Sequence, residues 1–175
     1  TEKLIMEKAR LMNESLIKDF RLQRPKIAVL GINPHCGDKG VIGTEDDEII
    51  RPALKKLYFD ENILVFGPFA ADSFFGSQTY RSYDAVLAPY HDQGLIAFKT
   101  IAFGNGVNYT AGLSKVRASP DHGTAYEIAG KDIADPQSFR QAIYTALDVF
   151  RNREEYAELT KNPLKIRTLE LEKDK

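Results

Sequence analysis

The start of the chain carries apolar residues at helical spacing. Every third or fourth position is apolar, with charged residues between, at Ile5, Ala9, Met12, Leu16 and Phe20. This spacing predicts an amphipathic helix, because residues three or four apart share one helix face. We expect Arg24-Pro25 to end the helix, since the residue before a proline avoids helical backbone angles.

Three short, continuously apolar segments predict buried strands. They are KIAVL at residues 26–30, ILVF at 63–66 and YDAVLAP at 83–89, and each runs into glycine, proline or a polar turn. An apolar run without alternation is typical of a strand covered on both faces, as in a parallel sheet.

The segments between these strands predict loops and helices. Four glycines and a proline indicate a loop over residues 31–43, and the capping-box residues TEDD at 44–47 precede a helix through residues 49–59. A short helix is expected over residues 70–75. Strands and helices therefore alternate, and the predicted fold class is α/β.

The last third of the chain is less regular. Residues 95–102 and 107–110 are candidate strands separated by a glycine-rich turn. Residues 138 to about 156 predict a long helix. The tail from Lys161 is charged, and we expect it to be frayed or exposed.

Composition narrows the possible functions. The 175 residues carry a formal net charge of −1, which gives no electrostatic case for binding nucleic acid or an anionic membrane. One cysteine excludes an internal disulfide framework and favours a reducing compartment. No apolar stretch approaches the ~18 residues of a membrane helix, and the charged N-terminal segment is not a signal peptide. Because the chain begins at Thr1 inside a predicted helix, we expect it to be a fragment of a longer protein.

All three histidines lie in polar, turn-like segments. His35 lies in GINPHCGD, His91 in YHDQG and His122 in DHGTA, and the first two segments follow predicted strands. The carboxyl ends of parallel strands are where ligands bind in open α/β sheets, and neutral imidazole is a common ligand of divalent metals. The alternative is a solvated or hydrogen-bonded loop histidine. A catalytic site needs three protein ligands, so a third must come from a carboxylate, another chain or an absent segment.

Other polar residues near these loops are candidates for supporting roles. Asp72 and Asp92 can orient a ligand histidine, although acidic residues beside turns are usually caps or turn formers. Cys36 is interpreted as a small loop residue rather than a ligand or nucleophile.

A second set of polar residues follows His91. Lys99, Asn108 and Arg117 suit an anionic substrate, because arginine binds carboxylate or phosphate with two hydrogen bonds. The alternative is three unrelated surface residues. The segment Gly104–Gly106 is not a dinucleotide-binding fingerprint.

Taken together and in order, these strings resemble a known family. GINPHCGD at 31–38, GPFAAD at 67–72, YHDQG at 90–94, FGNGVN at 103–108 and DHGTA at 121–125 closely resemble the C-terminal half of the 4-hydroxythreonine-4-phosphate dehydrogenase family. Residues 122–136 also look like the adenine-side cofactor loop of the isocitrate and isopropylmalate dehydrogenases. The resemblance implies their three-layer α/β/α fold, incomplete here because the N-terminal part is absent.

The resemblance also implies roles for individual residues. The implied metal ligands are His35 and His91, and the implied catalytic residues are Lys99 and Asp92. The implied substrate-binding residues are Lys99, Asn108 and Arg117. The implied cofactor-binding residues are His122, Gly123 and Thr124. The family's third metal histidine and a substrate-contacting His-Thr pair lie in the absent half. Residues 1–115 are then expected to form the substrate and metal lobe with dimer-interface elements, and residues 116–175 to return to the cofactor lobe.

The implied activity is oxidation and decarboxylation of 4-phosphooxy-L-threonine in pyridoxal 5'-phosphate biosynthesis. It implies NAD, or NADP, a divalent metal (Zn, Mg, Mn or Co), a cytoplasmic homodimer with a shared active site, and no nucleic-acid or membrane partner. Alternatives are a paralogue acting on another phosphorylated hydroxy acid such as 4-phospho-threonate, a non-catalytic metabolite-binding module, and a phosphate acyltransferase of related fold. The isolated chain is expected to be inactive, with part of its core exposed and prone to association.

Overall fold

The computed structural model describes residues 1–164, and the part of the predicted tail beyond residue 164 lies outside the described residues. The α-helices are α1 (Glu2–Lys18), α2 (Arg51–Phe59), α3 (Ala71–Gly76), α4 (His91–Ala102) and α5 (Gln137–Thr160). The strands are β1 (Ile27–Leu30), β2 (Val65–Phe69), β3 (Ala85–Leu87), β4 (Val107–Tyr109) and β5 (Ala118–Pro120). Short helical turns are η1 (Pro34–Gly40), η2 (Asp46–Ile50), η3 (Thr79–Ser82) and η4 (Tyr126–Ile128).

The three predicted buried strands form one parallel sheet in the order β2-β1-β3, which confirms the α/β class. All four residues of β1 are buried, as expected of a central strand. β2 continues to Phe69 rather than ending at Phe66. It passes so close to β1 that a Cβ on Gly67 would lie 2.4 Å from the Val29 oxygen, so glycine is what allows the strand to continue.

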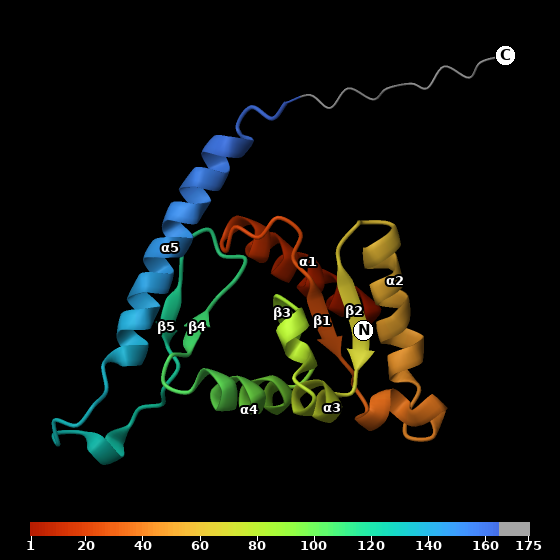
Figure 1. The fold of residues 1–175 in the computed structure, drawn as a ribbon, viewed down its shortest axis with the longest axis horizontal. Helices are drawn as coiled ribbons and strands as arrows, with labels where there is room; N and C mark the ends of the chain where they lie inside the picture. The colour runs from red at the N-terminus through yellow and green to blue at the C-terminus, as the bar shows by residue number, and fades with distance from the viewer. Residues whose placement is uncertain (165–175) are drawn as a thin grey trace.

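Helices lie on the two faces of this sheet (Figure 1). On one face, α1 and α2 pack a core around Ile27, Val29 and Leu57. On the other face, Phe74 of α3 packs with Ala28 and Leu30. Burial on both faces explains why β1 has no alternating polar positions.

Two further features of the N-terminal half differ from the prediction. Helix α1 ends at Lys18, and the buried Asp19 that follows takes the C-cap position. The helix therefore ends well before Arg24-Pro25. The side chain of Thr44 does not cap the next helical turn, because the N-cap position falls one residue later, at Glu45, and no side chain caps the turn there. The buried Asp46 instead turns its carboxylate toward the loop after β1.

The predicted strand over residues 95–102 is wrong, because these residues belong to helix α4. Leu95, Phe98 and Ala102 are half-buried at spacings of three and four, which is a helical period, whereas Ile96 and Ile101 are exposed. A short run that is apolar at almost every position satisfies both a strand and a helix pattern, and tertiary packing decides between them.

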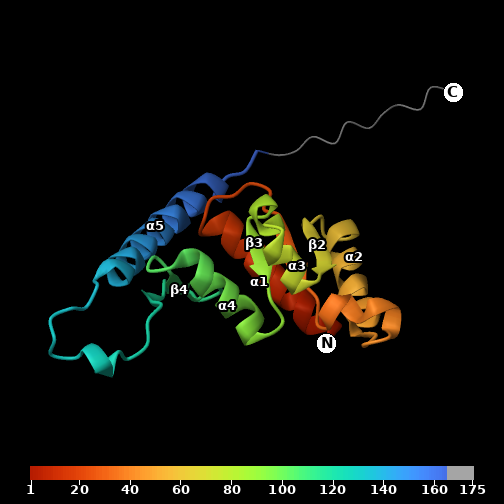
Figure 2. The same cartoon turned by 60° about the horizontal axis from the view of Figure 1, so that its bottom comes forward.

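The chain then leaves the parallel sheet. β4, predicted one residue longer, pairs antiparallel with β5, which the sequence did not predict, and the predicted long helix is confirmed as α5. Figures 1 and 2 show α5 lying along this hairpin, with α4 connecting it to the parallel sheet. No helix among residues 1–164 is long and apolar enough to cross a membrane.

Candidate functional site

The loop after β1 carries His35 in a constrained backbone. Residues 35–39 all have positive φ, between 44° and 88°, and a Cβ on Gly37 would lie 2.2 Å from the Gly43 oxygen. Such a conformation persists only where the surroundings enforce it. Here the buried Asp46 accepts hydrogen bonds from the amides of Ile32 (2.8 Å) and Asn33 (2.9 Å), which fixes the base of the loop.

The first turn of α4 carries His91 and follows the neighbouring strand β3. His91 Nδ1 donates to the Asp92 carboxylate at 2.8 Å, which leaves Nε2 of the exposed ring free. Gln93 Nε2 donates to the Gly31 oxygen at 3.0 Å. This bond ties the histidine-bearing turn of α4 to the end of β1, where the loop of His35 begins.

The arrangement fits a divalent metal in part. A carboxylate on Nδ1 fixes the tautomer that presents Nε2 to a metal, so Asp92 stands where an orienting group is needed. A cavity of about 340 Å³ beside this loop is lined by His35, Asp72 and Gln93 among others. Residues 1–164 nevertheless hold no cluster of three side chains that could ligate a metal, so a complete site needs a ligand from outside them.

Cys36 has the character of an inert thiol. Burial and the negative charge of Asp46 raise its pKa, so the thiol stays protonated at neutral pH. This agrees with its interpretation as a small loop residue.

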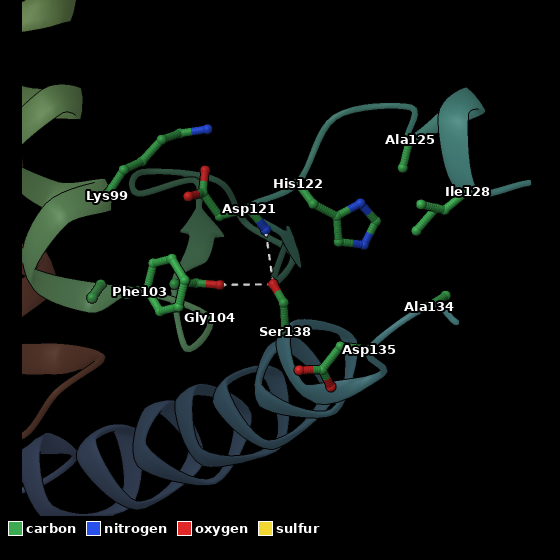
Figure 3. Close-up of a pocket in the computed structure, with 12 residues that line it drawn as sticks. Lys99, Phe103, Gly104, Asp121, His122, Ala125, Ile128, Ala134, Asp135 and Ser138 are labelled. Carbon is green, nitrogen blue, oxygen red and sulfur yellow. Dashed lines mark hydrogen bonds between the residues drawn. The ribbon is translucent and has the colours of Figure 1, made fainter. Parts of the chain in front are cut away.

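A larger cavity, of about 540 Å³, opens between α4, β5 and the start of α5 (Figure 3). Lys99 lines it from α4, and Asp121 and His122 line it from the segment after β5. Ser138 closes its floor, because its hydroxyl donates to the Gly106 oxygen and accepts from the Asp121 amide, each at 3.0 Å. The arrangement places one cation (Lys99), two carboxylates (Asp121 and Asp135) and one imidazole (His122) around a largely apolar cavity.

The structure brings only one of the three predicted cofactor residues to this cavity. His122 lines it, with Nδ1 2.9 Å from the Gly123 oxygen, whereas Gly123 and Thr124 are exposed in the adjoining segment and do not line it. A Cβ added to Gly123 would have no other atom within 4 Å, so the backbone at this position is accessible to a ligand.

Asn108 and Arg117 lie together on the β4–β5 hairpin, apart from the cavity of Lys99. Both are exposed. Arg117 Nη1 donates to the Thr110 hydroxyl at 2.9 Å, and the Thr110 amide donates to the Arg117 oxygen at 3.0 Å. The candidate residues therefore form three groups, namely the two histidine turns, the Lys99–His122 cavity and the hairpin.

Comparisons with known proteins cover the stretch of chain that carries these three groups. The profile of the family described as "PdxA: Pyridoxal phosphate biosynthetic protein PdxA" matches residues 1–146, which include every candidate residue. This chain belongs to the PdxA family. The resemblance inferred from the sequence is thereby confirmed.

Individual PdxA relatives are similar over nearly the whole chain. A 4-hydroxythreonine-4-phosphate dehydrogenase from Bacteroides thetaiotaomicron is 53% identical over 165 residues, covering 94% of this chain and 45% of the relative. One from Zymomonas mobilis is 46% identical over 158 residues, covering 90% and 47%. The chain thus spans about half the length of the curated relatives it matches.

Solved structures show the same partial coverage. A crystal structure of 4-hydroxythreonine-4-phosphate dehydrogenase from Klebsiella pneumoniae matches with a TM-score of 0.72 and 35% identity over 85% of this chain and 45% of that one. A terephthalate 1,2-cis-dihydrodiol dehydrogenase from Burkholderia xenovorans LB400 matches with a TM-score of 0.64 and 31% identity, covering 84% and 46%.

Several polar residues that build these PdxA segments were not singled out by the sequence. They are Asp46, Gln93, Asp121 and Ser138. Asp46 is one of a run of acidic residues and nothing local distinguishes it as the buried one. The bonds of Gln93 and Ser138 join residues 62 and 32 positions apart, so no local pattern reports them.

Proposed function

We propose that the native protein containing this chain is a divalent-metal-dependent, NAD-linked dehydrogenase. It oxidises 4-phosphooxy-L-threonine and decarboxylates the product to 3-amino-2-oxopropyl phosphate, a step toward pyridoxal 5'-phosphate. The observation that carries this proposal is the 53% identity, over 94% of the chain, to a relative that bears the name of this activity.

The hydride and proton balance of the proposed reaction is as follows. The carbinol carbon loses a hydride to NAD⁺ and the hydroxyl loses a proton. The resulting β-keto carboxylate releases CO₂, and a proton replaces it on carbon. A divalent cation bound between histidines would polarise the substrate oxygens in both steps.

In this proposal the residues of the chain bind and orient. His35 and His91 are two metal ligands, and Asp92 holds the His91 ring in the tautomer that exposes Nε2. Lys99 and Arg117 neutralise the anionic groups of the substrate, and Asn108 helps to bind it. The segment of His122, Gly123 and Thr124 holds the cofactor, NAD or NADP, and the cation is Zn, Mg, Mn or Co.

The proposal extends to the complete molecule. The missing part supplies the third metal ligand and completes a three-layer fold of the isocitrate dehydrogenase type. Residues 1–115 belong to the substrate and metal lobe and residues 116–175 to the cofactor lobe. The protein works in the cytoplasm as a homodimer with a shared site. The three separate groups of candidate residues support this extension, because none forms a complete site among residues 1–164.

A substrate panel tests the proposal. The native protein at full length is assayed for NADH formation with 4-phosphooxy-L-threonine, 4-phospho-threonate and a carboxylated cis-dihydrodiol, each with an added divalent metal. We expect the first to give the highest kcat/KM, and Arg117→Ala to lower that value by roughly 10- to 100-fold through loss of a charge-assisted contact.

The matched control is Arg81→Ala, since Arg81 lies at η3 on the surface of the parallel-sheet part. It should leave kcat/KM unchanged. Preference for 4-phospho-threonate or the dihydrodiol would instead assign the protein to a paralogue activity, and no turnover of any substrate would favour a binding module.

A further inference from the structure

A buried polar cluster joins the end of α1 to the β4–β5 hairpin and α5. Asp19 is only 2% exposed, and its carboxylate accepts hydrogen bonds from Ser15 Oγ (2.8 Å), Arg153 Nε (2.6 Å) and the Tyr109 hydroxyl. Arg153 Nη2 also donates to the Tyr109 hydroxyl at 2.9 Å. We call these four residues the Asp19 cluster.

The backbone around the cluster is tied in as well. Arg153 Nη1 donates to the Leu113 oxygen (3.0 Å), in the segment between β4 and β5, and Asn152 Nδ2 donates to the Asp19 oxygen (2.7 Å). The rings of Phe20 and Tyr109 meet edge to face at 5.5 Å. The hairpin is therefore held by α1 and α5 at its strand and at its connecting loop (Figure 1).

A buried ion pair is poor evidence for stability by itself. Removing two charges from water costs about as much as their attraction returns, and apolar replacements are often as stable. What such a pair does supply is a fixed geometry, because the bonds of Arg153 and Asp19 have defined directions. The question is which part of the molecule this geometry fixes.

The alternation of side chains along strand β4 shows which part of the molecule the cluster fixes. Successive side chains of a strand point to opposite faces, so Tyr109 faces the Asp19 cluster while Asn108 and Thr110 face the other way. Arg117 shares that other face, because its guanidinium bonds the Thr110 hydroxyl. The Asp19 cluster therefore contacts one face of the hairpin, and the opposite face carries the proposed substrate-binding residues Asn108 and Arg117.

We infer that Asp19 is a positioning residue that, through Tyr109 and Arg153, sets the hairpin so that Asn108 and Arg117 present one anion-binding face to the substrate. The inference rests on the proposed function for the role of that face. It does not require Asp19 to touch substrate, cofactor or metal.

Hydrogen–deuterium exchange tests the positioning directly. The variant is Tyr109→Phe in the native protein at full length, since it keeps the ring against Phe20 and removes only the hydroxyl bonded to Asp19 and Arg153. The readout is the Thr110 amide, bonded to the Arg117 oxygen, and the reference is the buried Ile27 amide of β1, bonded to the Leu64 oxygen. We expect exchange at Thr110 to become roughly tenfold faster or more, with Ile27 unchanged.

The matched control is Tyr58→Phe. Tyr58 also packs edge to face with a phenylalanine, Phe59 at 5.1 Å, but it lies on α2 away from the hairpin. It should leave Thr110 exchange unchanged. The inference would be overturned if Thr110 in Tyr109→Phe exchanged at the wild-type rate. It would also be overturned if exchange accelerated equally at Thr110 and Ile27, because that result would show a general loss of stability.

Binding of inorganic phosphate, followed by ³¹P NMR, separates this inference from the proposed function. We expect Arg117→Ala to abolish most phosphate binding and Tyr109→Phe to weaken it roughly threefold or more. If Arg117→Ala weakens binding and Tyr109→Phe does not, the positioning role is wrong and the anion-binding face stands. If Arg117→Ala has no effect while Thr110 exchange responds to Tyr109→Phe, the cluster positions the hairpin but the substrate role of that face is wrong, which overturns the inference as stated.

Discussion

Asp19 keeps a negative charge in the interior, and its surroundings decide the pH at which it can do so. Burial alone would raise the pKa of this carboxyl, but hydrogen bonds from Arg153, Tyr109 and Ser15 outweigh burial and bring the pKa below its ordinary value. A carboxyl with a lowered folded-state pKa stabilises the fold fully above its unfolded-state pKa of about 3.9. That stabilisation is lost as the pH falls through the lower, folded-state value.

The expected consequence is a steeper loss of stability in acid for the wild type than for Asp19→Asn. At neutral pH, Asp19→Asn should lower the free energy of unfolding by about 3 kcal/mol, because it leaves the Arg153 guanidinium without its charged partner. The difference should shrink below about pH 4. Urea denaturation of both proteins at a series of pH values measures it, and a difference that stays constant from pH 7 into acid would contradict this account of Asp19.

The location of a candidate residue was predictable from the sequence where the residue belongs to a short local motif. His35, His91 and Lys99 stand in short motifs, and the structure places all three beside cavities or strand ends. The Asp19–Arg153 pair was not predictable, since its partners are 134 positions apart and each looks like an ordinary charge on a helix. Local patterns report what one turn or strand does, and they cannot report which distant charges meet.

At the scale of elements, the buried strands and the long helix were predicted and α4 was not. β1 was predicted as a buried strand because its sequence is short, apolar and β-branched. The structure buries all four of its residues. Residues 95–102 are similarly apolar, but they belong to helix α4, which begins at His91. The spacing of apolar residues in so short a run does not distinguish a helix from a strand. β5 was missed because three residues containing a proline carry almost no strand signal.

Helix α5 has an apolar surface without a partner among the described residues. Its exposed apolar side chains at helical spacing, which we call the α5 stripe, are Phe139, Ile143, Leu147 and Phe150, each between 45% and 57% exposed. Relatives about twice as long have further chain to cover such a surface. In the isolated 175-residue chain the stripe faces water.

The isolated chain is therefore expected to self-associate through the α5 stripe. Leu147→Lys should shift it toward the monomer, because a charge at the centre of the stripe is costly to bury. The matched control is Asp148→Lys, an exposed position one residue along and outside the stripe. Sedimentation velocity over a concentration series measures the effect. A monomeric wild type, or equal effects of the two lysines, would contradict a role for the stripe.

At the scale of the whole molecule, the candidate residues lie in three separate groups. The two histidine turns, the Lys99–His122 cavity and the hairpin face are each well ordered by their own bonds. The chain spans about half the length of the relatives and solved structures it matches. The family could be inferred from the sequence because its motifs are local strings, whereas the described residues 1–164 bring no three possible metal ligands together.

The central claim is that the native protein couples oxidation of a phosphorylated substrate to loss of carbon dioxide. The most direct measurement is the ratio of NADH to CO₂ formed from 4-phosphooxy-L-threonine by the native protein at full length, with His91→Ala measured alongside. We predict equal amounts of the two products from the wild type and neither from His91→Ala. NADH without CO₂, or undiminished turnover by His91→Ala, would contradict the account.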